Sequence, residues 1–166
     1  MTWVIIAAVV MAIMGSVFWL KPSARDARLA DLRFNAIRAG LQVRQFTFKA
    51  DAAKTGVRDD ITATSYTLMK KASYENGGGH EDASGGELQY CVVRQPAWDD
   101  EWLPEGLSWH NKGTQGDAEK LAALLPELSD ELLMLEVYER RVCMMTAEKQ
   151  GSNAQHYLAF LEALLK

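Results

Sequence analysis

The chain of 166 residues is long enough for one domain of ordinary size with an appendage. Hydrophobic residues make up 48% and charged residues 24%, which excludes a chain that is mainly disordered or collagen-like. Two cysteines are too few for a small secreted scaffold that depends on disulfides.

The formal net charge of −4 is the sum of three segments of different character. Residues 1–20 carry no charged side chain, and residues 21–58 carry nine Lys or Arg against three Asp. Residues 59–166 carry nine Lys or Arg against nineteen Asp or Glu. We therefore predict a transmembrane helix over 1–20, a basic juxtamembrane helix over 21–40 and a cytoplasmic domain over the remainder, 41–166. The acidic domain would repel phosphates, so nucleic acid is not expected as a partner.

Residues 3–20, WVIIAAVVMAIMGSVFWL, predict a membrane span. As a helix this run rises about 27 Å, close to the roughly 30 Å thickness of the hydrocarbon core. Trp3 and Trp19 lie near its ends, as aromatic residues do at membrane interfaces. No Lys or Arg precedes the run and bulky residues follow it, so an uncleaved span is favoured over a signal peptide. A buried helix of a folded core is the remaining alternative.

The basic residues all follow this run, which predicts its orientation. Bases beside a span stay in the cytoplasm, so we expect the N-terminus outside a bacterial inner membrane and the domain inside the cell. Those nearest the span are expected to attract anionic lipid. They are Lys21, Arg25, Arg28 and Arg33.

Small residues in the span recur at a spacing of four and share one helical face. Such a face lets two helices approach closely, so it predicts association with a second copy or a membrane partner. The alternative is that small residues are simply common in spans. The face consists of Ala8, Ala12 and Ser16.

Residues 22–40 predict an amphipathic helix beside the membrane. Ser23 and Asp26 form a capping box at its start, and Gly40 suits the position after its end. Its apolar positions can lie on lipid headgroups or pack on the domain, and the sequence favours neither arrangement. They are Leu29, Leu32, Ala36 and Ile37.

The rest of the chain predicts an α+β domain, in which an antiparallel sheet of about five strands carries helices on one face. Strands are expected over 41–48, 61–71 and 87–95 because these segments alternate or are rich in β-branched residues. Residues 130–149 can form two strands or one buried helix. The hairpin is favoured because the charged run Glu139–Arg141 would interrupt a helical stripe.

Two further helices and three loops complete the prediction. Asp117 is expected to begin a helix that Pro126 interrupts, and Ser152 is expected to cap the last helix. Polar, glycine-rich or irregular composition predicts loops over 49–60, 75–86 and 96–116. The glycine-rich loop ENGGGHEDASGG is interpreted as flexible, or as a segment that orders on contact with a partner.

The stretch WDDEWLPEGLSW, residues 98–109, is the most suggestive for function. Its tryptophans can pin an irregular loop to the core while its acids remain solvated. They can also form a binding surface, since Trp is favoured where proteins bind each other. Paired carboxylates could perform acid–base chemistry if a cleft raised one pKa. The candidate partner-binding residues are Trp98, Asp99, Asp100, Trp102 and Trp109.

Motifs for other chemistry are missing from the sequence. It contains no phosphate-binding glycine loop, no C-x-x-C pair and no histidine pair at metal-ligand spacing. Cys91 and Cys143 are expected to be buried reduced thiols. We therefore predict no catalytic residue, no metal and no cofactor.

An N-terminal span followed by the run KPSARDARLADLRFNAIRAGLQVR resembles small proteobacterial inner-membrane proteins that are labelled preprotein translocase auxiliary subunits. The resemblance covers residues 1–44. In authentic auxiliary subunits a glycine-containing strand motif follows the juxtamembrane segment, and this motif has no counterpart here. The resemblance implies a topology and a partnership with a membrane complex, and it implies no functional residues.

The leading hypothesis is a non-enzymatic accessory or scaffold subunit of a bacterial inner-membrane complex. Its cytoplasmic domain would bind a membrane-protein partner, or the protein would associate with itself. The alternatives are a membrane-tethered enzyme whose active site forms no local motif, and a sensory domain for a small ligand.

Overall fold

The computed structural model describes residues 2–19, 23–70 and 86–166, and the chain divides into two units, 1–31 and 32–166. The predicted glycine-rich loop and Lys21 therefore lie largely or wholly outside the described residues.

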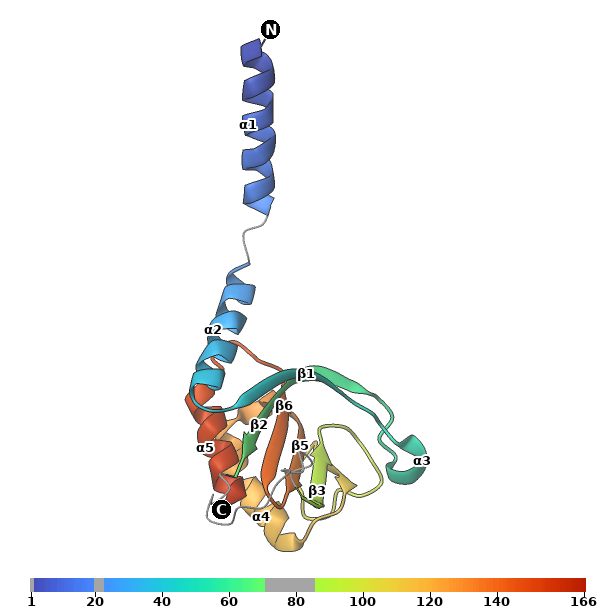
Figure 1. Ribbon diagram of the computed structural model, residues 1–166. Helices are drawn as coiled ribbons and strands as arrows, with labels where there is room; N and C mark the ends of the chain where they lie inside the picture. Colours follow the sequence, from blue (N-terminus) through green and yellow to red (C-terminus); the bar gives the residue numbers. More distant parts are fainter. Residues whose placement is uncertain (1, 20–22, 71–85) are drawn as a thin grey trace. The chain divides into compact units, whose positions relative to one another are not determined.

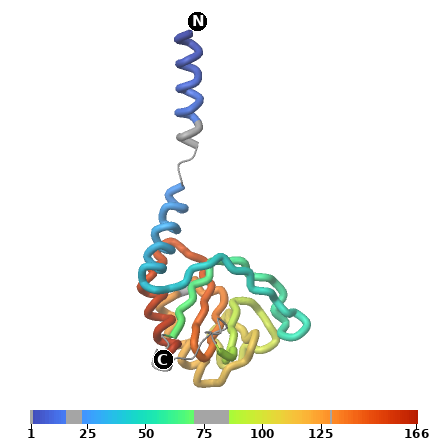
Figure 2. The backbone as a smooth tube through the Cα atoms, viewed as in Figure 1, coloured from blue at the N-terminus to red at the C-terminus, as the bar shows by residue number. Residues whose placement is uncertain are grey.

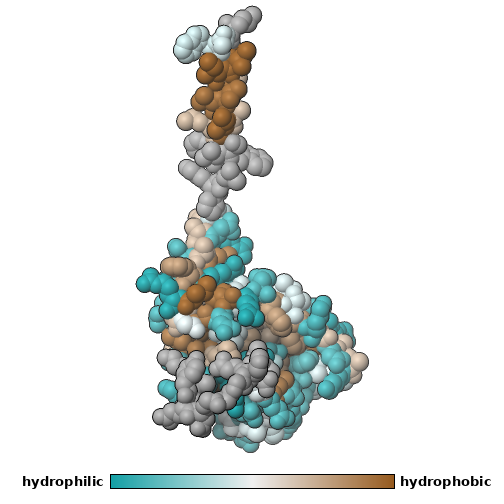
Figure 3. All heavy atoms as spheres, in the orientation of Figure 1, coloured by the Kyte–Doolittle hydropathy of each residue, from teal (hydrophilic) through white to brown (hydrophobic). Residues whose placement is uncertain are grey.

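The first unit consists of α1 (Thr2–Trp19) and the beginning of α2 (Ala24–Arg38). Exposed apolar residues cover much of α1, which appears brown in Figure 3. Among the described residues, no helix combines the length and hydropathy that a membrane crossing requires. The capping box at the start of α2 is confirmed, since the Ser23 hydroxyl accepts from the Asp26 amide at 3.1 Å and donates to its carboxylate at 2.7 Å.

The second unit is a mixed α+β structure around one antiparallel sheet in the order β1-β2-β6-β5-β3-β4 (Figure 1). The prediction of about five strands was one strand short of the six observed. The favoured hairpin over 130–149 is confirmed. The strands are β1 (Gln42–Phe48), β2 (Ile61–Met69), β3 (Leu88–Val93), β4 (Ser108–Asn111), β5 (Leu132–Tyr138) and β6 (Arg141–Thr146).

The additional strand, β4, lies within the segment expected to be a loop over 96–116. Its four residues, SWHN, are too few to alternate visibly, and only Trp109 places a large apolar side chain in the core. The expected loop over 49–60 likewise contains a single helical turn, α3 (Ala52–Thr55). Both elements are too short for a periodic pattern to predict.

Two longer helices follow, α4 (Gln115–Leu124) and α5 (Ala154–Leu165), and both begin with caps other than those expected. Thr114 caps α4 and forms a capping box with Asp117, which occupies the third helical position. Asn153 caps α5 in place of Ser152, whose hydroxyl donates instead to Glu131 at 2.6 Å. The short 3-10 turns η1 (Leu125–Glu127) and η2 (Ser129–Glu131) connect α4 to β5.

One face of the sheet carries the larger core, against which α4, α5 and the end of α2 pack. Leu32 and Ala36 of α2 are buried in this core. Part of the apolar stripe that was predicted over residues 22–40 therefore packs on the domain. Phe34 and Ile37, on another face of the same helix, are exposed.

The opposite face of the sheet is covered in part by the curved strands β1 and β2 of the same sheet. The β1–β2 ribbon curves toward the side of the sheet where β4 lies (Figure 2). The ring of Phe48 in β1 meets that of His110 in β4, with centroids 4.8 Å apart. These strands are the two edges of the sheet. A second, smaller core fills the space that this curvature encloses, and it includes Val57, Val93 and Met145.

Candidate functional site

Residues 96–107, between β3 and β4, form an irregular segment that we call the tryptophan loop. The structure separates its predicted candidates into two groups. Trp109, just beyond the loop, is 2% exposed, whereas Trp98 is 71% exposed and Trp102 is 47% exposed. Trp109 is therefore a buried anchor next to the loop, and the loop itself presents two large aromatic side chains at the surface.

Trp109 fixes the loop to the body of the domain. Its indole nitrogen donates to the carbonyl of Glu101 at 3.0 Å, and its backbone amide donates to the carbonyl of Asp99 at 2.8 Å. Its ring meets that of Tyr90 edge-on, with centroids 5.9 Å apart. These contacts give Trp109 a structural role and hold the loop in one conformation.

Trp102 has a backbone conformation that bulky residues rarely adopt. Its φ is 66°, in the left-handed region, where a residue with a Cβ is less stable by roughly 1–2 kcal/mol. Burial of the ring does not offset this strain, because the side chain is half exposed. Strained backbone that carries an exposed aromatic side chain is typical of functional surfaces.

Lys112, which follows β4, links three residues of the loop. Its ammonium lies 2.9 Å from the carboxylate of Asp99 and 2.8 Å from that of Glu101. It also lies 5.0 Å from the centre of the Trp102 ring, within cation–π range. Hydrogen bonding to Lys112 lowers the pKa of Asp99, so this carboxyl is ionised at neutral pH and is poorly suited to donate a proton.

An open hollow of about 390 Å³ lies beside Trp98. Gly56, with a φ of 82°, forms part of its wall, and a Cβ at this position would lie 2.7 Å from the Trp98 ring. Gln95 and Asp59, which also line the hollow, exchange two hydrogen bonds, of 3.1 and 2.6 Å. Trp98 thus rests on glycine backbone while most of its ring faces solvent.

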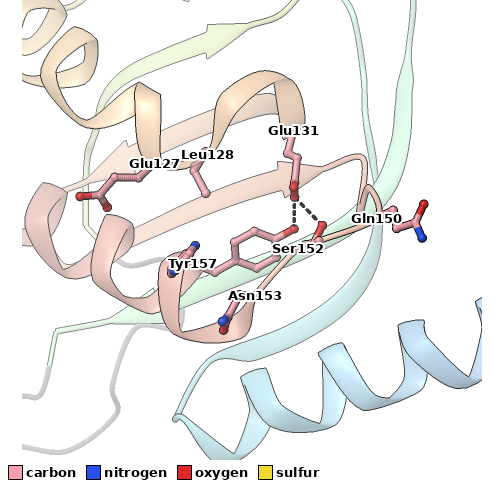
Figure 4. A pocket seen from close by; sticks show the side chains of 9 residues that line it. Glu127, Leu128, Glu131, Gln150, Ser152, Asn153 and Tyr157 are labelled. Atoms are coloured by element: carbon pink, nitrogen blue, oxygen red, sulfur yellow. Dashed lines mark hydrogen bonds between the residues drawn. The ribbon is translucent and has the colours of Figure 1, made fainter.

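A second hollow, of about 280 Å³, lies at the start of α5 (Figure 4). Glu131 from η2 points into it, and its carboxylate accepts from the hydroxyls of Ser152 and Tyr157. Burial is the main cause that raises the pKa of the Tyr157 phenol, which keeps it protonated. The polar groups of this hollow therefore bind each other and hold α5 against η2.

Arg33, predicted to face lipid, is bound by the domain. Its guanidinium donates twice to the carboxylate of Glu148, at 2.9 and 2.6 Å, and once to Thr64 at 2.9 Å. Tyr66 also donates to Glu148, at 2.6 Å. Burial alone would raise the pKa of Glu148, but the hydrogen bonds from Arg33 and Tyr66 outweigh it and lower the pKa.

The other candidates from the sequence lie apart from the tryptophan loop. Arg25 and Arg28 lie on the first part of α2, and Ala8 and Ala12 are exposed on α1. The Ser16 side chain is outside the described part. Asp100 is exposed in the loop, and its backbone carbonyl accepts from Leu103 at 3.0 Å.

A row of reactive residue types crosses the sheet on the face opposite the helices. Cys91, Glu136 and Cys143 lie directly opposite one another on neighbouring strands. Burial is the main cause that raises the pKa of both thiols, and it also raises the pKa of Glu136. Both cysteines are buried and free, as expected, and they remain protonated at neutral pH.

Sequence reasoning missed Lys112, Gly56 and Glu148. Each acts through partners that lie ten or more residues away, so no local spacing reveals it. Over the ranges that the structure describes, no group of three or more His, Cys, Asp or Glu side chains could hold a metal ion.

Comparison with known proteins identifies no relative. No protein-family model matches the chain, and no curated protein or solved structure matches it either.

Proposed function

We propose that this protein is a membrane-anchored, non-enzymatic accessory or scaffold subunit of a bacterial inner-membrane complex. Its domain binds a protein partner through the tryptophan loop. The observation that carries the proposal is the exposure of Trp98 and Trp102 on a loop that Trp109 holds rigid from the core.

Both exposed rings have the properties of binding hot spots. A tryptophan can bury about 150–250 Å² of surface, and Trp is enriched among the few residues that dominate binding energy. Because the loop is already ordered, little conformational entropy is lost when a partner binds. The hollow beside Trp98 offers a recess for a side chain of the partner.

The proposed anchor rests on the uncharged run over 3–20, on Trp3 and Trp19 near its ends and on the bases that follow it. This arrangement implies an outer N-terminus and a cytoplasmic domain. Anionic lipid would interact with Lys21, Arg25 and Arg28, whereas Arg33 is engaged by Glu148. The face formed by Ala8, Ala12 and Ser16 is available for association in the membrane.

The alternative of a tethered enzyme would depend on the row formed by Cys91, Glu136 and Cys143. A nucleophilic cysteine needs a lowered pKa, and burial raises the pKa of both thiols. In the part of the chain described, Glu136 is the carboxyl whose pKa is raised, and it lies between these two inactive thiols. This environment favours a structural role, and the geometry supports binding over catalysis.

The proposal is tested by co-purification from native membranes in mild detergent, with Trp98→Ala and Trp102→Gly as variants. Glycine accepts a φ of 66° without strain, so Trp102→Gly removes the ring without weakening the loop backbone. Both variants should lose a near-stoichiometric membrane partner while remaining in the membrane fraction.

Phe34→Ala is the matched control, because it removes an exposed aromatic side chain from α2, outside the loop. It should keep the partner. If the two loop variants retain the partner at wild-type levels, or if the wild-type protein purifies alone, the proposed function is wrong.

A further inference from the structure

Lys112 occupies a site that the chain builds for a cation. Asp99 and Glu101 each place a carboxylate oxygen within 3 Å of its ammonium, and the Trp102 ring lies 5.0 Å from it. We call these three residues the cation seat. Lys112 is itself 42% exposed, so the seat is open to solvent.

The acidic residues of the tryptophan loop outnumber the one base, Lys112, that pairs with them. The tryptophan loop carries four acidic residues and no basic residue. Lys112 pairs with two of them, and Asp100 and Glu105 are exposed and have no ion-pair partner among the described residues. An acidic loop with two exposed indole rings is complementary to a segment that carries Lys or Arg.

We propose that the tryptophan loop recognises a lysine- or arginine-bearing segment of its protein partner, and that a cation of that segment takes the place of Lys112 in the cation seat. This inference rests on the proposed function and adds the chemistry of the partner. An acidic segment would instead meet Asp99, Asp100, Glu101 and Glu105 and be repelled.

Exchange of one cation for another at this seat is energetically feasible. Ion pairs at exposed positions contribute little, because water screens them and the long side chain loses conformational freedom. Lys112 therefore opposes an incoming cation only weakly. An arginine would gain further, since its planar guanidinium can bind a carboxylate with two hydrogen bonds and stack on an indole ring.

The test uses the full chain in non-ionic detergent and two labelled peptides, one rich in lysine and one with glutamine at each lysine position. Binding is measured by fluorescence anisotropy. Lys112→Met empties the seat and should raise affinity for the lysine peptide about fivefold. Trp102→Gly should lower it about tenfold without changing the protein's charge.

Lys120→Met is the control, because it makes the same charge change on α4. Its effect on affinity should be clearly smaller than that of Lys112→Met, and the glutamine peptide should bind none of the proteins. Thermal unfolding of each variant establishes that it is folded.

Equal affinities of the Lys112→Met and Lys120→Met variants would overturn the inference, as would unchanged affinity of the Trp102→Gly variant. Failure of the lysine peptide to bind either the wild type or the Lys112→Met variant would overturn it as well. These outcomes are distinct from failure of the proposed function, since co-purification can still depend on Trp98 and Trp102 when the peptide does not bind.

Discussion

The ion pair between Arg33 and Glu148 gives the sharpest prediction about stability. Arg33→Met keeps the aliphatic stem and the helix propensity of α2 but removes the guanidinium. The Glu148 carboxylate, which is 8% exposed, then loses the two hydrogen bonds from the guanidinium and keeps the one from Tyr66. Removing the oppositely charged partner of a buried carboxylate is strongly destabilising.

The magnitude follows from the burial of the two partners. Breaking a fully buried pair costs about 3–5 kcal/mol, but Arg33 is 39% exposed, so water can partly replace it. We expect Arg33→Met to lower the free energy of unfolding by about 2–3 kcal/mol. For a domain of this size the melting temperature should fall by about 6–12 °C.

The assay is thermal unfolding of the full chain in detergent, followed by near-ultraviolet circular dichroism. The double variant Arg33→Met/Glu148→Gln also removes the buried negative charge that Arg33 balanced, and it should recover part of the loss. Phe34→Ala, next to Arg33 but exposed, serves as the control and should change stability little. A loss below about 0.5 kcal/mol for Arg33→Met would refute the reasoning.

The pH dependence supplies a second check. The pKa of Glu148 is lowered in the folded wild type, so its stabilisation is present above the unfolded pKa and is lost as pH falls through the folded value. Arg33→Met removes the hydrogen bonds and the charge of the guanidinium, which lower this pKa, so we expect the pKa of Glu148 to rise in the variant. The difference in stability between wild type and Arg33→Met should therefore be largest near neutral pH and should narrow below about pH 4.5.

Three further substitutions test individual contacts by thermal unfolding. Thr114→Ala removes the cap of α4 and should cost about 1 kcal/mol; an unchanged melting temperature would contradict the cap. Gly56→Ala should destabilise more than Gly151→Ala, because both have positive φ but only the Gly56 position clashes with Trp98; equal losses would show that the contact is unimportant. Burial raises the pKa of Glu136, so the folded state favours its protonated form, and the stability that this form contributes is lost as pH rises. Glu136→Gln replaces it with an uncharged side chain and should therefore stabilise the protein at neutral pH; a destabilised variant at pH 7 would contradict this.

Local patterns predicted those parts of the fold that depend on near neighbours. The capping box of Ser23 and Asp26 spans three residues, and the hairpin of β5 and β6 shows alternating apolar residues on each side of a charged turn. The cap of α5 was missed because Ser152 and Asn153 are both good capping residues. The choice between them depends on Glu131, which is distant in sequence and binds the Ser152 hydroxyl.

The composition of the sequence identified the candidate site but did not predict which of its residues are buried and which are exposed. Three tryptophans among acidic residues identified the stretch, yet burial of Trp109 depends on the pairing of β4 with β3. The left-handed backbone at Trp102 and the position of Lys112 depend on the folded loop. Local spacing also failed to resolve the helix predicted over 22–40. It grouped Leu32 with Ile37, whereas packing on the sheet buries Leu32 and leaves Ile37 exposed.

Site-specific photocrosslinking in native membranes tests the central claim most directly. A photoreactive residue is placed at position 98, at position 102 and, as a control on α2, at position 34. The account predicts that the same membrane protein is crosslinked from positions 98 and 102 and not from position 34. A product absent from both loop positions, or formed equally from position 34, would contradict it.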